Sequence, residues 1–318
     1  MSADDENPPV PDPPGPDRLS HDRLSHDRLS HDQLSRALTQ QNYFADEGLI
    51  TAIRLALALG RPLLLEGEPG VGKTEVARVL AAVLDRELIR LQCYEGLDAS
   101  QALYEWDYPK QLLSLRAAEV EGRGVGTLYG DEFILERPLL RALRAEHGSV
   151  LLIDEIDRAD SEFEAFLLEF LDTFQITIPE VGTVAAVTAP LVVLTSNRTR
   201  ELHDALKRRC MYHWIPFPDA ARERAIITAQ APGLSERSAA QLVTAINSIR
   251  GLRLLKRPGI AESIAWAQGT RMLVGEGSPW SEAMRRCLGL LVKHEDDLIL
   301  VSEHASEVFG RDEPRDER

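Results

Sequence analysis

The segment RPLLLEGEPGVGKTEVARVLAAVL, residues 61–84, determines how the rest of the chain is interpreted. It begins with the apolar run PLLLEG, which predicts a short buried strand. The next residues, GEPGVGKT, have the spacing GxxxxGK[ST], and the apolar residues after them recur at helical spacing. A glycine loop between a strand and a helix is the context that a phosphate-binding loop requires. The segment therefore predicts a nucleotide-binding α/β domain.

The positions of this loop have distinct expected tasks. Its three glycines permit a tight path whose backbone N–H groups face the phosphates, with the helix dipole adding attraction. We expect Lys73 to reach the β and γ phosphates of ATP and the Thr74 hydroxyl to bind Mg²⁺. Together with Asp154, discussed next, the expected nucleotide-binding residues are Gly67, Glu68, Pro69, Gly70, Val71, Gly72, Lys73, Thr74 and Glu75.

A second chemical element is SVLLIDEIDRAD, residues 149–160. Residues 150–153 form an apolar run typical of a central parallel strand covered on both faces. Asp154 and Glu155 follow at its carboxyl end, where α/β sheets place ligands. Asp154 is expected to hold the Mg²⁺ shell and Glu155 to orient and deprotonate an attacking water. The alternative is a pair of capping acids at a strand-to-helix turn.

A third element, APLVVLTSNRTRELHDALKRRCMYHWIPF, repeats this logic at residues 189–217. Residues 191–195 predict another buried strand, and Asn197 follows with an amide able to bond both a water and the γ-phosphate. Three basic residues, Lys207, Arg208 and Arg209, then precede Cys210.

Here the sequence resembles the AAA+ ATPases. The resemblance places Asn197 at the sensor 1 position and makes Arg209 the finger that enters a neighbouring subunit's site, with Arg208 as a rival for the same role. Such a finger neutralises charge that develops on the transferred phosphoryl group. A solvated basic helix end, favoured by the helix dipole, is the alternative for this cluster. The catalytic residues expected on this basis are Lys73, Glu155, Asn197 and Arg209.

The resemblance narrows to one branch. Three segments look like the MoxR branch of AAA+ proteins: GRPLLLEGEPGVGKT, IDEIDRAD and LLEFLDTFQITIPEVGT. Within it, LQCYEGLDASQALYEWDYPKQLL is similar to the CoxD-like ATPases associated with maturation of carbon monoxide dehydrogenase and related molybdenum hydroxylases. The resemblance implies an ATP-hydrolysing chaperone that forms a homo-oligomeric, hexameric ring. It also implies a partner with a von Willebrand factor A (VWA) domain and a metalloenzyme client.

The expected organisation has four parts. Residues 1–40 are expected to be a disordered arm with RLSHD repeats, and residues 41–218 a three-layer αβα AAA+ core around a parallel sheet. Residues 219–310 are expected to form a small lid of four helices, followed by a disordered tail at 311–318. The five-residue period of the repeats puts His21, His26 and His31 on no common face. A flexible or partner-binding arm is therefore favoured over a histidine metal site.

Aromatic residues gather in residues 91–113. The MoxR resemblance implies that residues 91–95 are the second strand of the sheet and that residues 96–113 are the segment where MoxR proteins carry an insertion. Tyr104, Trp106 and Tyr108 alternate with acids, so they either contact a protein substrate or partner or pack beneath the sheet. Further along, residues 174–187 predict a hairpin.

One position departs from the resemblance. MoxR proteins offer a sensor 2 arginine to the γ-phosphate at the start of a lid helix, but Glu262 falls at that place in KRPGIAESIAWA. The sequence offers Arg253, Lys256 and Arg257 as substitutes, and an exposed loop charge is the alternative for each.

Composition limits the possible partners. The net charge of −15 gives no electrostatic footprint for nucleic acid or an anionic membrane. The cysteines, Cys93, Cys210 and Cys287, fit neither a disulfide framework nor a metal site, and no apolar run approaches a membrane span. A cytoplasmic protein is therefore expected.

Two other functions stay open: a DNA-acting AAA+ ATPase of the helicase or clamp-loader type, and a nucleotide-gated scaffold without hydrolysis. A small-molecule P-loop kinase is disfavoured, since it needs neither a finger nor a lid.

Overall fold

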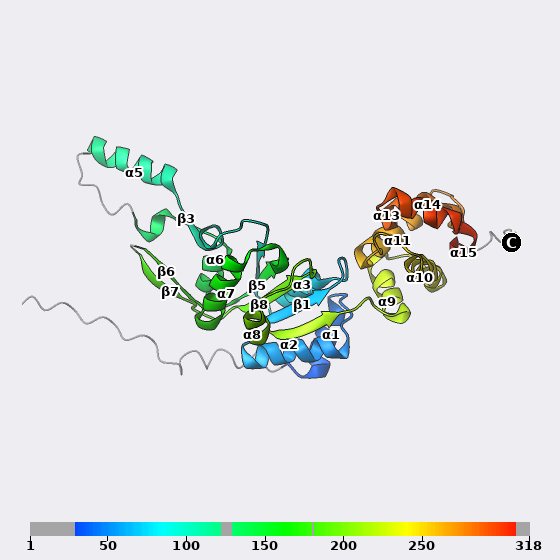
Figure 1. The fold of residues 1–318 in the computed structure, drawn as a ribbon, viewed down its shortest axis with the longest axis horizontal. Coiled ribbons are helices and arrows are strands. Elements are labelled where there is room, and N and C mark those ends of the chain that lie inside the picture. Colours follow the sequence, from blue (N-terminus) through cyan, green and yellow to red (C-terminus); the bar gives the residue numbers. More distant parts are fainter. Residues whose placement is uncertain (1–28, 122–128, 180, 310–318) are drawn as a thin grey trace, which may run out of the picture.

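A computed structural model describes residues 29–121, 129–179 and 181–309, and its centre is a parallel sheet of five strands (Figure 1). Every paired neighbour in this sheet runs parallel. In spatial order the strands are β2 (Glu87–Gln92), β5 (Ser149–Asp154), β8 (Leu191–Ser196), β1 (Leu63–Gly67) and β9 (Met211–Ile215). The three strands β5, β8 and β1 are buried along their whole length because helices cover both faces.

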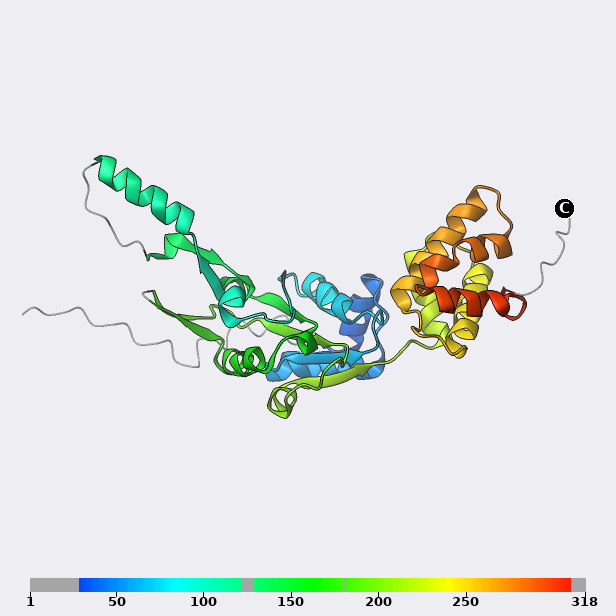
Figure 2. The same cartoon turned by 45° about the horizontal axis from the view of Figure 1, so that its top comes forward.

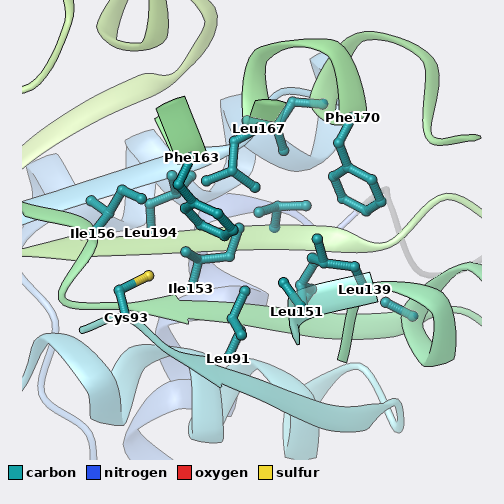
Figure 3. Packing of buried hydrophobic residues seen from close by; sticks show 14 of the residues in the cluster. Leu91, Cys93, Leu139, Leu151, Ile153, Ile156, Phe163, Leu167, Phe170 and Leu194 are labelled. Atoms are coloured by element: carbon teal, nitrogen blue, oxygen red, sulfur yellow. The ribbon is translucent and has the colours of Figure 1, made fainter. Parts of the chain in front are cut away.

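Two hydrophobic cores make the sheet the middle of three layers. One core lies under α1 (His31–Gln40), α2 (Glu47–Leu59) and α3 (Lys73–Val83). The other lies under α4 (Ala99–Leu103), α6 (Pro138–Arg144), α7 (Ser161–Thr173) and α8 (Asp204–Arg209). Figure 3 shows the second core, where Phe163 and Leu167 of α7 pack with Leu151 and Ile153 of β5. Each such side chain contributes about 1.5–3 kcal/mol when fully buried. The predicted αβα core with a parallel sheet is confirmed.

The second strand was placed a few residues too late. It spans residues 87–92, not 91–95, and Gln92 lies opposite Asp154 in the parallel register. The chain then turns, with Leu97 N–H bonded to the Tyr94 carbonyl. The segment ELIRLQ alternates as a strand does. Ile89 and Leu91 are buried in the second core, while the exposed Arg90 faces the other way.

The N-terminal arm was predicted to be too long. Residues 31–40 form α1, which begins with a capping box between Ser30 and Gln33. Leu34 and Leu38, one helical turn apart, are fully buried in the first core. This burial offsets the entropy cost of ordering the segment. Residues 1–28 of the predicted arm, which include His21 and His26, lie outside the described residues.

The insertion after β2 is mixed in structure and extends away from the sheet (Figures 1 and 2). It consists of α4, β3 (Tyr104–Trp106), α5 (Tyr108–Glu121), the 3₁₀ turn η3 (Asp131–Phe133) and β4 (Ile134–Glu136). Tyr104 and Trp106 are half-buried and pack against the second core, whereas Tyr108 is 65% exposed. Packing therefore accounts for the first two aromatics and leaves Tyr108 on the surface. The predicted hairpin is confirmed as β6 (Gln175–Ile178) paired antiparallel with β7 (Gly182–Ala185).

The C-terminal part is helical and has its own core around the fully buried Trp266. Its helices are α9 (Ala220–Gln230), α10 (Glu236–Gly251), α11 (Ile260–Gly275), α12 (Trp280–Arg286), α13 (Leu288–Leu291), α14 (Glu295–Glu303) and α15 (Ala305–Phe309). The last of the four predicted lid helices, expected over residues 282–305, is divided, because Val292 and His294 adopt extended backbone between α13 and α14. The predicted tail at 311–318 lies outside the described residues. Among the described helices, none has the length and apolar character needed to cross a membrane.

Candidate active site

The glycine loop takes the conformation that its residues predict. Gly70 and Gly72 have φ angles of 80° and 91°, a left-handed region that glycine enters without steric cost. At Gly67 the reason is space, because an added Cβ would lie 2.5 Å from the Ile215 carbonyl oxygen on β9. The helix α3 begins directly after the loop, at Lys73, so its N-terminus faces the loop interior.

Lys73 is folded back over the loop. Its side chain is buried, and its ammonium donates to the carbonyl oxygens of Gly67 at 2.8 Å and Glu68 at 2.9 Å. Burial lowers the pKa of this ammonium, while the nearby carboxylates of Asp157 and Asp154 act in the opposite direction. The ammonium therefore already lies inside the loop that would enclose a phosphate.

The predicted metal residues meet as expected. Thr74 Oγ1 donates to Asp154 Oδ1 at 3.0 Å, and Thr195 Oγ1 donates to the same oxygen at 2.5 Å. Asp154 itself is buried at the end of β5. A hydroxyl and a carboxylate side by side are hard oxygen donors of the kind that Mg²⁺ prefers, so the donor set fits this ion. Thr195 was not among the predicted site residues.

Two further residues from β2 enter this site without having been predicted. Arg90 donates to Asp154 Oδ2 through Nη2 at 2.6 Å and Nε at 3.1 Å. Gln92 donates through Nε2 to Glu155 Oε2 at 3.0 Å. The signal in the sequence was the alternation of β2, which puts both residues on one face, opposite the end of β5.

Glu155 lies at the centre of a polar cluster. Its Oε1 accepts from Asn197 Nδ2 at 3.3 Å, and its Oε2 lies 3.1 Å from Arg158 Nη1. The residue has φ 55° and ψ 51°, a conformation that costs a non-glycine residue about 1–3 kcal/mol and often occurs at functional sites. Thr195 supports it by accepting from the Glu155 N–H at 2.9 Å.

Asp157 fixes the loop that carries Asn197. Its Oδ2 accepts from Asn197 N–H at 3.2 Å, Thr199 N–H at 2.9 Å and the Thr199 hydroxyl at 2.7 Å. The carboxylate is buried, and within the described part of the chain Oδ1 has no hydrogen-bond partner. Sequence reasoning did not assign this acid, although it stands in the same DEID segment as Asp154.

The predicted finger residues lie apart from this cluster. Arg209 ends α8 and binds residues of α7, donating to the Leu168 carbonyl at 2.9 Å and pairing with Asp172 at 2.6 Å. Arg208 is exposed and makes no ion pair with the described residues. Neither arginine lines the cavity of its own chain.

A cavity of about 540 Å³ joins the predicted residues. It is lined by the polar residues Lys73, Thr74, Asp154, Glu155 and Asn197, and also by Tyr43 and by residues of α9 and α11 such as Ile226 and Ile264. The cavity is thus lined by the predicted loop residues from Pro69 to Glu75 and by the predicted residues of the two strand ends, but not by Gly67, Glu68 or the two arginines.

The helical region lines part of the cavity and contacts the glycine loop through the main chain. Ile260 N–H donates to the Gly70 carbonyl at 2.8 Å. Gly259 packs closely on Gly70, so a Cβ added at Gly259 would lie 2.8 Å from the Gly70 Cα. Glu262 accepts from Gly259 N–H at 3.0 Å and so caps α11. Three residues were predicted as substitutes for the sensor 2 arginine: Arg253, Lys256 and Arg257. All three are exposed, and none of them lines the cavity.

An unpredicted arginine from α9 does line it. Arg222 donates through Nε to the Phe44 carbonyl and through Nη1 to Asp46 Oδ2 at 3.2 Å. Because Asp46 also caps α2, this contact connects the start of the αβα core to the helical region.

Comparison with known proteins identifies the domain. Residues 62–210 match the AAA domain of the dynein-related subfamily. An uncharacterized protein of Staphylococcus haemolyticus is 25% identical over 193 residues, which cover 59% of this chain and 67% of that protein. One from a bovine strain of Staphylococcus aureus is 25% identical over 227 residues, covering 70% and 80%. A solved RuvB mutant of Thermotoga maritima covers 88% of this chain and 78% of its own, with 17% identity and a TM-score of 0.49. The domain match and the sheet together confirm an AAA+ P-loop NTPase fold.

Proposed function

We propose that this chain, with its AAA domain, binds ATP together with Mg²⁺ in the described cavity and hydrolyses it. The observation that carries the proposal is the convergence of Lys73, Thr74, Asp154, Glu155 and Asn197 on one cavity from three separate segments of sequence. Residues of these types in this arrangement have no structural need to be together, since a buried acid cluster beside a buried ammonium is costly to assemble.

Binding uses groups that are already in place. The loop N–H groups and the N-terminus of α3 attract phosphate oxygens, and the Lys73 ammonium exchanges its two carbonyl partners for the β and γ phosphates. Thr74 and Asp154 would hold Mg²⁺, which neutralises phosphate charge and orients the phosphates when it is bound. The apolar part of the cavity lining, which includes Ile226 and Ile264, suits a nucleobase.

Hydrolysis follows from the acid cluster. Glu155 accepts a proton from a water whose oxygen attacks the γ-phosphorus, and the bond to the bridging oxygen of ADP breaks. Asn197, held by Asp157, can orient that water and the γ-phosphate together. In the described structure Glu155 is bonded to Gln92, Asn197 and Arg158, so it must release some of these contacts before it can bind the water.

The finer parts of the proposal concern assembly and clients. AAA+ ATPases commonly form oligomeric rings, and the resemblance of the segments quoted above supports a hexameric MoxR-type chaperone with a VWA-domain partner and a metalloenzyme client of the carbon monoxide dehydrogenase kind. In such a ring Arg209, or its rival Arg208, reaches a neighbour's cavity. We also propose the division into a core of residues 41–218 and a lid of residues 219–310.

The test separates binding from hydrolysis. We expect the purified chain to bind fluorescent mant-ATP and to release phosphate, with activity per chain rising as the protein assembles. Glu155→Gln should keep the affinity for mant-ATP but lower phosphate release by about 10²–10⁴-fold. Wild-type binding without phosphate release at any protein concentration would reduce the proposal to a nucleotide-gated scaffold, and absence of binding would refute it.

A further inference from the structure

The carboxylate of Asp154 is saturated with hydrogen bonds in the described structure. Its Oδ1 accepts from the hydroxyls of Thr74 and Thr195, and its Oδ2 accepts twice from the guanidinium of Arg90. The two threonines are neutral and belong to the loop and the sheet next to the acid. Arg90 is the charged partner, and it takes the oxygen that the hydroxyls leave open.

The position of Arg90 follows from the register of the sheet. Arg90 lies two residues before Gln92, which is opposite Asp154, so both side chains are on the α3 face of the sheet. Arg90 Nη2 also donates to Gln92 Oε1, and Gln92 in turn donates to Glu155. The guanidinium is therefore connected to both acids of the pair, directly to Asp154 and through Gln92 to Glu155.

The two partners of this ion pair differ in their freedom to move. The Asp154 side chain is 4% exposed, whereas the Arg90 side chain is 53% exposed. The acid is held in place by burial and by two hydroxyls, while the guanidinium can turn into solvent without losing a buried environment.

We propose that Arg90 occupies Asp154 in the absence of metal and must be displaced when Mg²⁺ enters with the nucleotide, so that Arg90 sets the Mg²⁺ concentration that the site requires. The inference rests on the proposed function, since it assigns a role at the same site. Two effects act in the same direction. The guanidinium competes for Oδ2, and its positive charge beside the site repels a second cation.

The experiment measures metal dependence and not turnover. The dissociation constant of mant-ADP is determined at a series of free Mg²⁺ concentrations, and also in EDTA, for the wild type, Arg90→Gln and Arg90→Lys. The control is Arg141→Ala, which removes another surface ion pair of β2, to Glu87 at its opposite end. Melting temperatures of all variants confirm that each one folds.

The expected result is a change only in the Mg²⁺ midpoint, which is the free Mg²⁺ concentration at which the affinity for mant-ADP is halfway between its values in EDTA and at saturating Mg²⁺. Arg90→Gln should lower the midpoint about fivefold, because it removes a competing positive charge that solvent partly screens. Arg90→Lys, which keeps the charge, and Arg141→Ala should stay near the wild-type midpoint, and affinities in EDTA should be equal. An unchanged or raised midpoint in Arg90→Gln overturns the role of Arg90 while leaving nucleotide binding intact. Absence of mant-ADP binding by the wild type at every Mg²⁺ concentration overturns the proposed function as well.

Discussion

A buried ion pair in the helical region offers a sharp test of how that region is held together. The Arg250 guanidinium binds the Glu223 carboxylate through two bonds, 2.7 Å and 2.9 Å long, and Glu223 is fully buried. In Arg250→Met, the carboxylate would keep only the Ser263 hydroxyl, which donates to it at 3.0 Å. Leaving a buried charge without its partner costs about 3–5 kcal/mol, so we expect a loss of that size in the free energy of unfolding.

The assay is urea unfolding followed by far-ultraviolet circular dichroism, with two comparison variants. Arg237→Met on the same helix replaces an exposed arginine and should stay within about 0.5 kcal/mol of the wild type. The double variant Glu223→Gln/Arg250→Met removes the buried charge and should be about 2 kcal/mol more stable than Arg250→Met alone. If Arg250→Met were no less stable than Arg237→Met, or the double variant no more stable than Arg250→Met, the reasoning would be refuted.

Two other predictions concern pH and assembly. Burial lowers the pKa of His213, so the unfolded chain binds a proton that the folded chain resists. The melting temperature should therefore fall as pH drops below about 6.5, and His213→Gln should weaken this dependence; identical pH profiles would contradict it. Arg209→Ala should lose phosphate release, and mixing it with Lys73→Ala should restore part of it, because an intact finger would then face an intact cavity. Lack of recovery in demonstrably mixed assemblies would exclude Arg209 as the residue acting across subunits.

The nucleotide loop and the acid pair were predictable because their signals are local. Gly67 to Thr74 are contiguous, and a parallel sheet brings the ends of its strands to one edge. That rule places Asp154 and Asn197 beside the loop even though they are distant in sequence. The structure adds only the partners that hold them, such as Thr195 and Asp157.

Arg90, Gln92 and Arg222 were missed because their roles depend on pairing and not on composition. The alternation of β2 shows that Arg90 and Gln92 share a face, but only the register against β5 shows that this face meets Asp154 and Glu155. Arg222 depends on how α9 sits against the start of the nucleotide domain. The helix α1 was not predicted because the five-residue period of the repeats leading into it matches no helix, although Leu34 and Leu38 are four residues apart and share a helical face.

The contact between the helical region and the glycine loop is made by backbone atoms and not by the arginine that the MoxR resemblance predicts. The resemblance predicts an arginine where Glu262 stands, yet this carboxylate caps α11 and thereby fixes the start of the helix beside the loop. The link itself is the bond from Ile260 N–H to the Gly70 carbonyl, and it requires glycine at 259 because a Cβ there would meet Gly70. The glycine loop and the start of α11 are therefore joined directly through backbone atoms. Such a connection depends on the absence of a side chain, so the charged residues nearby, including Arg253 and Arg257, gave no indication of it.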